Sequence, residues 1–467
     1  KFIPQFSKSM LLLGMLFLFS PSTTSAQQSR VLRTHSISTP TLQQTQVPTT
    51  GTLNVVAVMV QFQPDTNRLT SGTGIFGNDG MEGLPYLSNQ TDTRIDPLPH
   101  NQQYFESHLE FAKNYFEKSS DDQLTLNYTV LPGVFTLPKK MEEYSPIGEE
   151  FTLDKLGDLL NDTWTAVEDA GGFNATGLDP ENTAFVIFHA GVGRDIELTG
   201  TSLDITPYDI PSIYLRKQDL QNIFENPSFS GFPINGGAFR VTNSLIIPRT
   251  ESRRAEDISG NEVVFPLSIN GLLCASIGSH LGLPDLFNTD TGEPAIGRFG
   301  LMDGAGFFAY NGLLPPEPSA WEKIYLGWET PFEITPQTDG AIYLPATSLD
   351  QPNSIAKLSL SSSEYFLIEN RHRDPENDGL IITIRTPDGT EVQQSFTNND
   401  SELIYQESDF DTLLTAGTII DVDNFDFSLP GGLEIGDDEE EGTADDRELN
   451  GGILIWQIDE AIINQKL

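Results

Sequence analysis

The chain has 467 residues and a formal net charge of −41 at pH 7, from 26 Lys and Arg against 67 Asp and Glu. That length is sufficient for two or three domains around a large hydrophobic core. The excess of negative charge excludes nucleic acid and anionic membranes as partners, because both would repel the protein.

The N-terminal segment is typical of an export signal. Two lysines precede an apolar run over residues 11–19, and small residues follow up to Ala26. This order predicts a secretory signal peptide over residues 1–26. We therefore expect a secreted protein, either extracellular or at the cell surface. The apolar run is too short to cross a bilayer, and no later segment is apolar enough to do so.

The next segments predict a linker followed by regular structure. Residues 27–51 are rich in Thr, Ser, Gln and Pro, which predicts a disordered linker or a pro-segment. The β-branched run over 53–62 predicts a buried strand. Apolar residues at helical spacing predict an amphipathic helix over 103–118. The alternation over 124–137, broken at Pro132-Gly133, predicts a β-hairpin.

Helices and strands continue to alternate after the hairpin. A helix is predicted over 153–170, and buried strands are predicted over 184–191 and over 239–247, where Pro248 is expected to stop the strand. This alternation predicts the α/β fold class, with one layered domain over residues 52–330.

From residue 331 the sequence becomes rich in strand-forming segments. A long polar insertion there contains Asp437–Glu441, a run of acidic residues that we expect to be exposed. Residues 331–467 are thus predicted as a β-rich region, and the chain is expected to continue beyond Leu467, because the last strand lies close to it. The predicted strands are 341–345, 356–360, 365–370, 380–385 and 453–459.

The most informative segment is Gly271–Asp285, GLLCASIGSHLGLPD, followed by Phe299–Gly304, FGLMDG. This layout resembles the zinc helix, glycine turn, third-ligand aspartate and methionine turn of the immune inhibitor A-like secreted metallopeptidases. The resemblance covers residues 52–467, interrupted by insertions. It continues at segments 54–62, 116–120, 185–191, 318–328, 366–371 and 453–459.

The resemblance implies a metzincin-like metallopeptidase domain with zinc as its cofactor. In that family the helix reads His-Glu-x-x-His-x-x-Gly-x-x-Asp. Counting back from Gly282 and Asp285, the catalytic positions hold Ala275, Ser276 and Ser279. Alanine has no donor atom and serine is a poor zinc ligand, so only Asp285, the third-ligand position, keeps a ligand side chain. The sequence predicts that zinc is not bound.

Other side chains near this motif allow further hypotheses. Met302 belongs to the methionine turn and is expected to fill a gap in the core. Ser276 and His280 share a helix face, but no orienting acid or oxyanion hole is visible for a serine–histidine pair. His280 is otherwise expected at a partly exposed helix end, and His189 either in the cleft or in the core. Cys274, the single cysteine, is predicted to be buried and inert.

Two loops offer oxygen atoms at alternating positions, as calcium sites do. They contain Asn288, Asp290 and Glu293 in one case and Asp421–Asn424 in the other. Neither loop has the terminal bidentate Glu, so ordinary Asp/Asn turns are the alternative.

Together these features predict an exported homologue of the immune inhibitor A-like peptidases that has lost zinc and binds polypeptide in a retained cleft. Two other interpretations stay open. One is an active secreted zinc metalloendopeptidase with unconventional ligands. The other is a structural surface protein whose cleft is filled by side chains.

Overall fold

The computed structural model describes residues 30–32, 47–88, 94–146, 153–198, 203, 206–256, 259–289, 291–338, 340–349, 351–397, 413–430, 432–434 and 447–466. The predicted signal peptide and the acidic run 437–441 lie outside these residues. Within the expected linker, β1 (Arg30–Leu32) pairs antiparallel with β5 (Ile196–Leu198). No helix in the described part of the chain is both long and apolar enough to span a membrane.

A five-stranded sheet forms the centre of the molecule, in the order β3-β2-β4-β9-β6. The first four strands are mutually parallel, and β6 is an antiparallel strand at the edge. The predicted α/β class is therefore confirmed. The strands are β2 (Gly51–Gln61), β3 (Leu124–Thr136), β4 (Thr183–Val192), β6 (Ile213–Leu215) and β9 (Ser244–Thr250).

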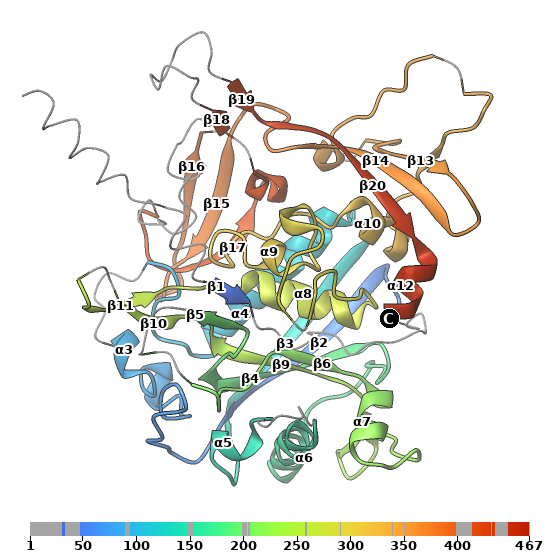
Figure 1. Ribbon diagram of the computed structural model, residues 1–467. Coiled ribbons are helices and arrows are strands. Elements are labelled where there is room, and N and C mark those ends of the chain that lie inside the picture. The colour runs from blue at the N-terminus through green and yellow to red at the C-terminus, as the bar shows by residue number, and fades with distance from the viewer. Residues whose placement is uncertain are drawn as a thin grey trace, which may run out of the picture.

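Helices cover both faces of this sheet, which explains its continuous apolar strands. Val55, Ala57 and Met59 of β2 contribute to one hydrophobic cluster, and the residues between them contribute to a second cluster on the opposite face. Figure 1 shows α5, α6 and α7 below the sheet and α4 and α8 above it. The bounds are α4 (Gln102–Ser119), α5 (Met141–Tyr144), α6 (Asp154–Asp169), α7 (Lys217–Ile223) and α8 (Asn270–His280).

Two strand predictions were wrong at prolines. Residues 124–136 form one 13-residue strand rather than a hairpin, and β3 runs parallel to β2 with an irregularity near Pro132. An edge strand tolerates such a residue, because its outer side needs no hydrogen-bond donor. Residues 239–247 are divided between β8 (Phe239–Val241) and β9, and β9 continues through Pro248. The antiparallel neighbour β6 accompanies β9 only as far as Ile246.

The region after residue 331 is rich in strands, as predicted, although residues 341–345 form none. It contains a four-stranded sheet, β12-β13-β14-β20, and a three-stranded sheet, β16-β15-β17. Their bounds are β12 (Phe332–Glu333), β13 (Ile355–Ser359), β14 (Glu364–His372), β15 (Leu380–Arg385), β16 (Glu391–Phe396), β17 (Thr418–Val422) and β20 (Gly451–Asp459).

Shorter elements complete the described structure. The helical ones are η1 (Asn78–Gly80), α3 (Pro85–Ser88), η2 (Gly297–Phe299), α9 (Gly304–Phe307), α10 (Ala320–Leu326), η3 (Thr347–Leu349), η5 (Phe425–Ser428) and α12 (Glu460–Lys466). The remaining strands are β7 (Phe232–Ile234), β10 (Arg253–Glu256), β11 (Glu262–Phe265), β18 (Gly432–Glu434) and β19 (Arg447–Leu449).

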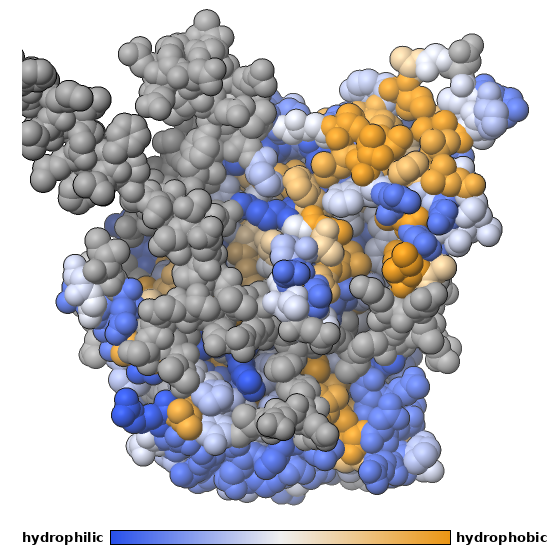
Figure 2. Space-filling view, in the orientation of Figure 1, coloured by the Kyte–Doolittle hydropathy of each residue, from blue (hydrophilic) through white to orange (hydrophobic). Residues whose placement is uncertain are grey.

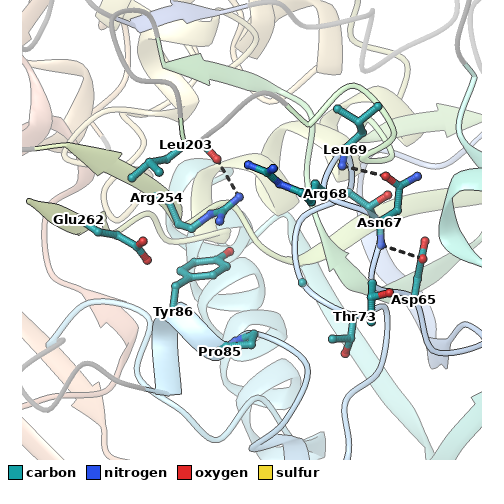
Figure 3. Close-up of a pocket in the computed structure, with 13 residues that line it drawn as sticks. Asp65, Asn67, Arg68, Leu69, Thr73, Pro85, Tyr86, Leu203, Arg254 and Glu262 are labelled. Atoms are coloured by element: carbon teal, nitrogen blue, oxygen red, sulfur yellow. Dashed lines mark hydrogen bonds between the residues drawn. The ribbon is translucent and has the colours of Figure 1, made fainter. Parts of the chain in front are cut away.

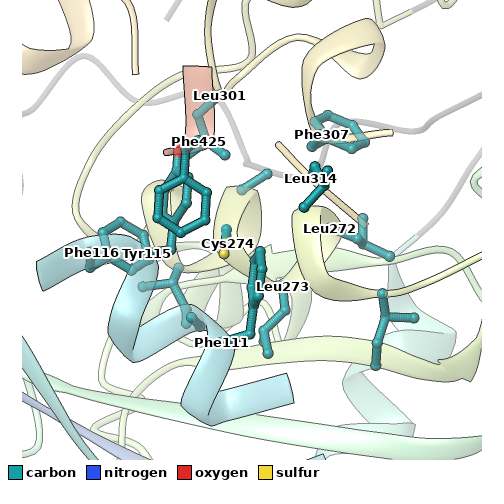
Figure 4. Packing of buried hydrophobic residues seen from close by; sticks show 14 of the residues in the cluster. Phe111, Tyr115, Phe116, Leu272, Leu273, Cys274, Leu301, Phe307, Leu314 and Phe425 are labelled. Atoms are coloured by element: carbon teal, nitrogen blue, oxygen red, sulfur yellow. The ribbon is translucent and has the colours of Figure 1, made fainter. Parts of the chain in front are cut away.

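The hydrophobic core continues from the α/β layers into the β-rich region. One cluster includes Phe111 and Tyr115 of α4, Leu273 of α8 and Phe425 of η5, and Figure 4 shows these side chains packed around Cys274. A buried ion pair reinforces this contact, because the Arg371 guanidinium donates to the Asp426 carboxylate and to the Phe299 and Glu317 carbonyls.

Candidate functional site

Helix α8 forms where the motif predicted a helix, and all of its residues are buried. A helix that is apolar on every side belongs in a core rather than at a surface. Its first residue, Asn270, is held by two distant segments. The Asn270 amide donates to the Ile419 carbonyl at 3.0 Å, and its oxygen lies 2.6 Å from Nδ1 of His108 on α4.

Two glycines permit the close packing of α8 and the turn that follows it. A Cβ atom at Gly271 would lie 2.0 Å from the Phe307 carbonyl oxygen, so a side chain there would displace α9. Gly282 has φ +102°, and the Leu283 and Gly282 amides donate to the Gly278 and Ser279 carbonyls. This is a Schellman ending, which requires a left-handed residue after the helix.

The three positions that the sequence resemblance assigns to catalytic residues contain no zinc ligand. Ala275 contributes a buried methyl group. The Ser276 hydroxyl donates to the Leu272 carbonyl at 2.8 Å, and the Ser279 hydroxyl donates to the Ala275 carbonyl at 3.2 Å. Both hydroxyl protons are therefore used by the helix backbone, as is common for serines inside helices.

The two segments that follow α8 lie against each other, although they are distant in sequence. The Leu286 amide, directly after Asp285, donates to the Met302 carbonyl at 2.8 Å. Asp285 is half-buried, whereas Met302 is fully buried. The Met302 sulfur packs below α8, where it would lie 2.9 Å from a Cβ at Gly278. Met302 thus fills a space in the core beneath the helix.

Two carboxylates shape the turn around Met302. Asp303 accepts the Ala305 amide, which caps α9, and it also accepts the amides of residues 295–297 at 2.7–3.0 Å. Glu322 of α10 accepts the Met302 amide at 2.8 Å and the amides of Leu301 and Ser319. The turn is therefore fixed by backbone groups that point at buried carboxylates.

The histidines near the site are buried and neutral at ordinary pH. Burial lowers the pKa of His280 to about 4 and that of His189 to about 3. His280 lies at the end of α8, but it is fully buried rather than partly exposed, and its Nδ1 contacts the Tyr214 hydroxyl at 3.2 Å. His189 accepts the Gly191 amide and packs against Phe62 within the sheet.

The surroundings of Ser276 and Cys274 bear on whether either residue can act as a nucleophile. The Ser276 hydroxyl points to the Leu272 carbonyl rather than to His280. Cys274 is a free, fully buried thiol, and burial raises its pKa well above the ordinary value. A neutral thiol in an apolar cluster is a weak nucleophile.

The donor atoms present do not fit a catalytic zinc ion, which requires three protein ligands and a water position. Among the residues that the structure describes, no three His, Cys, Asp or Glu side chains form a group that could hold a metal ion. Asp290 of the first predicted calcium loop lies outside the described residues. In that loop, Asn288 accepts the Thr291 amide, and its backbone amide donates to the Glu293 carbonyl.

The second predicted calcium loop also uses its oxygen atoms within the protein. Asp421 pairs with Lys118 at 2.6 Å, and Asp423 accepts the Ile381 amide at 2.9 Å. Asn424 accepts the Asp426 amide. Calcium binding at either loop stays a prediction.

A cleft of about 710 Å³ opens beyond the carboxyl end of β2. Loops after parallel strands are where open α/β sheets bind ligands. Figure 3 shows the guanidinium groups of Arg68 and Arg254 turned toward each other across the cleft, above Tyr86. Arg254 also lies over the Tyr86 ring at 5.8 Å and donates to the Leu203 carbonyl. Asp65 and Glu262 add negative charge to the lining.

A group of buried charged residues lies where β4 and β9 end. The carboxyl groups of Asp195 and Glu251 repel each other when both are charged, and Arg253 lies 3.6 Å from Asp209. All four side chains are buried. Burial raises the pKa of Asp209 to about 6 and that of Glu251 well above its ordinary value.

No known protein family matches this chain, and no curated protein matches it either.

The sequence located α8 and its turns but did not indicate the cleft. Arg68, Tyr86 and Arg254 come from three separate segments, and only the fold brings them together. The buried acids had a weak signal, because Asp195 and Glu251 follow predicted buried strands closely. Charged residues at the ends of parallel strands are a recurrent sign of a functional edge.

Proposed function

We propose that the chain is an exported, zinc-less relative of the immune inhibitor A-like metallopeptidases that binds polypeptide without cleaving it. The observation that carries the proposal is the chemistry at Ala275, Ser276 and Ser279. Their side chains are buried, and both hydroxyl protons are used by helix carbonyls. Zinc hydrolysis needs imidazole or carboxylate ligands and a general base, and these three residues supply none.

The geometry after α8 supports the relationship to that family. The Gly282 turn, the Asp285 segment and the buried Met302 follow the helix in the order that the resemblance implies, and Leu286 joins the last two. Glu322, within the segment after the methionine turn, holds that turn in place. These residues have architectural roles that do not depend on a metal.

The cleft beyond β2 supports the polypeptide-binding part of the proposal. Its volume of about 710 Å³ lies within the range of ligand sites in proteins. Arg68 and Arg254 can donate to peptide carbonyls or carboxylates, and Tyr86 presents an aromatic face. A cleft with these groups can hold an extended chain without any reacting atom nearby.

The test combines metal analysis with binding and cleavage of unfolded casein. We expect far less than one zinc per chain after equilibration with zinc, no chelator-sensitive cleavage of casein, and saturable casein binding. The double substitution Arg68→Glu with Arg254→Glu should weaken that binding at least about tenfold, or about 1.4 kcal/mol. The matched control Arg240→Glu changes an exposed arginine outside the cleft and should leave binding intact.

The possible results separate the three interpretations. Stoichiometric zinc with chelator-sensitive cleavage would establish an active peptidase and refute the proposal. Absence of casein binding would refute the binding role and favour a structural surface protein.

A further inference from the structure

Strand β20 is the last strand of the four-stranded sheet, and it leaves one edge open. It pairs with β14 along its full length, from Asp459 opposite Glu364 to Gly451 opposite His372. On its other side, no strand among the described residues pairs with it. A long unpaired edge presents backbone N–H and C=O groups to any extended chain.

The same strand carries exposed apolar side chains. Ile453 and Ile455 are 55% and 64% exposed, and the facing residue of Ile455 on β14 is Ile368. Along β14 the inward residues are buried and the outward ones are half-buried. We name the outward surface the outer apolar face, and Figure 2 shows apolar residues gathered over β13, β14 and β20. It consists of Phe332, Leu358, Phe366, Ile368, Ile453 and Ile455.

Soluble proteins usually protect such an edge, but the sequence of β20 and its described pairing carry none of the protective devices that a strand itself can provide. Lysine, proline, bulges and very short strands prevent pairing with other chains. The nine residues of β20, GGILIWQID, contain no basic residue and no proline, and their pairing with β14 has no register shift. An open edge and an apolar face thus coincide on one strand, which is what strand addition requires.

Charge decides which extended chain fits this edge. A second copy of the protein would bring together two chains of net charge −41, and a large net charge keeps proteins apart. The end of β20 is acidic, because Asp459 lies opposite Glu364 and is followed by Glu460. A chain that pairs antiparallel to β20 would place its N-terminal end beside these carboxylates.

We propose that the open edge of β20 binds an extended polypeptide, antiparallel, with alternating apolar residues and with Lys or Arg at its N-terminal end. The apolar residues extend the outer apolar face, and the basic end pairs with Asp459 on β20 itself. The carboxylates lie at one end of β20. The edge therefore favours a partner with a basic N-terminal end, and the position of these carboxylates fixes the direction in which that partner pairs. This surface is separate from α8 and from the cleft beyond β2, so it does not depend on the function proposed above.

The probe is a synthetic peptide, Lys-Lys-Thr-Ile-Thr-Ile-Thr-Ile-Thr, labelled at its C-terminus and titrated with the full chain by fluorescence anisotropy. We expect saturable binding that weakens at least about tenfold, or about 1.4 kcal/mol, when Ile453→Lys and Ile455→Lys are combined. The control Met81→Lys changes a side chain of similar exposure, 50%, in a different region and should bind like the wild type. A peptide with glutamates in place of the lysines should bind at least about tenfold more weakly, and high salt should reduce that difference.

Hydrogen exchange locates the peptide. On its addition, amides of residues 451–459 should become protected, while amides of β2 should not change. Four results would overturn the proposal. The first is no binding of the probe, and the second is equal binding of the glutamate peptide. The third is protection of β20 in the isolated protein, which would mean that the chain itself covers the edge. The fourth is a dimer that Ile455→Lys dissociates, which would identify a second copy as the partner.

Discussion

Among single residues, Glu251 makes the stability of the folded protein depend on pH. It belongs to the group of buried charged residues at the ends of β4 and β9. Its carboxyl group is buried beside that of Asp195, and burial together with the charges of Asp195 and Asp209 raises its pKa well above the ordinary value. Arg253 acts in the opposite direction. The folded protein therefore retains a proton that the unfolded chain releases. Stability from this proton is complete below the unfolded pKa of about 4.3, and it is lost as pH rises through the folded pKa.

We predict that Glu251→Gln is more stable than the wild type at about pH 8, because the amide is neutral at every pH and brings no buried negative charge next to Asp195 and Asp209. The difference should grow by up to about 1.4 kcal/mol for each pH unit between the two pKa values. Urea unfolding at several pH values between about 4 and 8.5 measures it. The control Glu262→Gln removes an exposed carboxyl group and should follow the wild-type profile. A Glu251→Gln profile parallel to that of the wild type would contradict the raised pKa of Glu251.

At the scale of elements, the turn around Met302 depends on one carboxylate of α10. Glu322 is fully buried and accepts the amides of Leu301, Met302 and Ser319. Leaving one buried donor without a partner costs about 1–3 kcal/mol. We predict that Glu322→Ala lowers the free energy of unfolding by about 3–5 kcal/mol and that Glu322→Gln lowers it less, because the amide oxygen still accepts.

The matched control is Glu333→Ala in the short strand β12, where the carboxylate is half exposed and its ion pair with Lys357 spans 3.6 Å. An exposed pair of this kind contributes about 0–1 kcal/mol. Urea unfolding of the three variants tests the comparison. Equal losses for Glu322→Ala and Glu333→Ala would show that the turn does not depend on Glu322.

Elements with a strong local signal were predictable from sequence, and those that depend on distant contacts were not. The periodic segments gave α4, α6, β2 and β4 nearly to their ends, because apolar spacing follows burial directly. Pro132 and Pro248 were interpreted as breaks, yet both lie within strands, since a strand with an open side needs no donor there. No local pattern distinguishes these cases.

The same limit applies to the candidate site. The glycine turn after α8 follows from Gly282, whose conformation is local. The burial of His280 does not, because it depends on Tyr214 of β6. The cleft was invisible in the sequence for the same reason, since Arg68 and Arg254 meet only in the folded chain.

For the whole molecule, the net charge of −41 opposes the packing that holds the two regions together. Only 26 basic residues are present, so repulsion among carboxylates exceeds attraction across ion pairs. Exposed pairs such as Lys139–Asp158 contribute only about 0–1 kcal/mol each, so their weakening by salt costs less than the relief of repulsion among the more numerous carboxylates gains. Salt screens exposed charges over about 10 Å at 0.1 M and over shorter distances at higher concentration.

We therefore predict that raising sodium chloride from about 0.02 M to about 0.5 M increases the melting temperature by a few degrees, on the order of 1–2 kcal/mol of stability. Tetramethylammonium chloride at the same ionic strength should act equally, because screening does not depend on the identity of the cation. A melting temperature that stays constant or falls would show that ion pairs outweigh repulsion.

Calcium chloride at matched ionic strength separates screening by a cation from binding of that cation at a site. A further rise at low calcium concentration would locate a bound ion, for which Asn288 and Asp423 lie in the loops to examine by substitution.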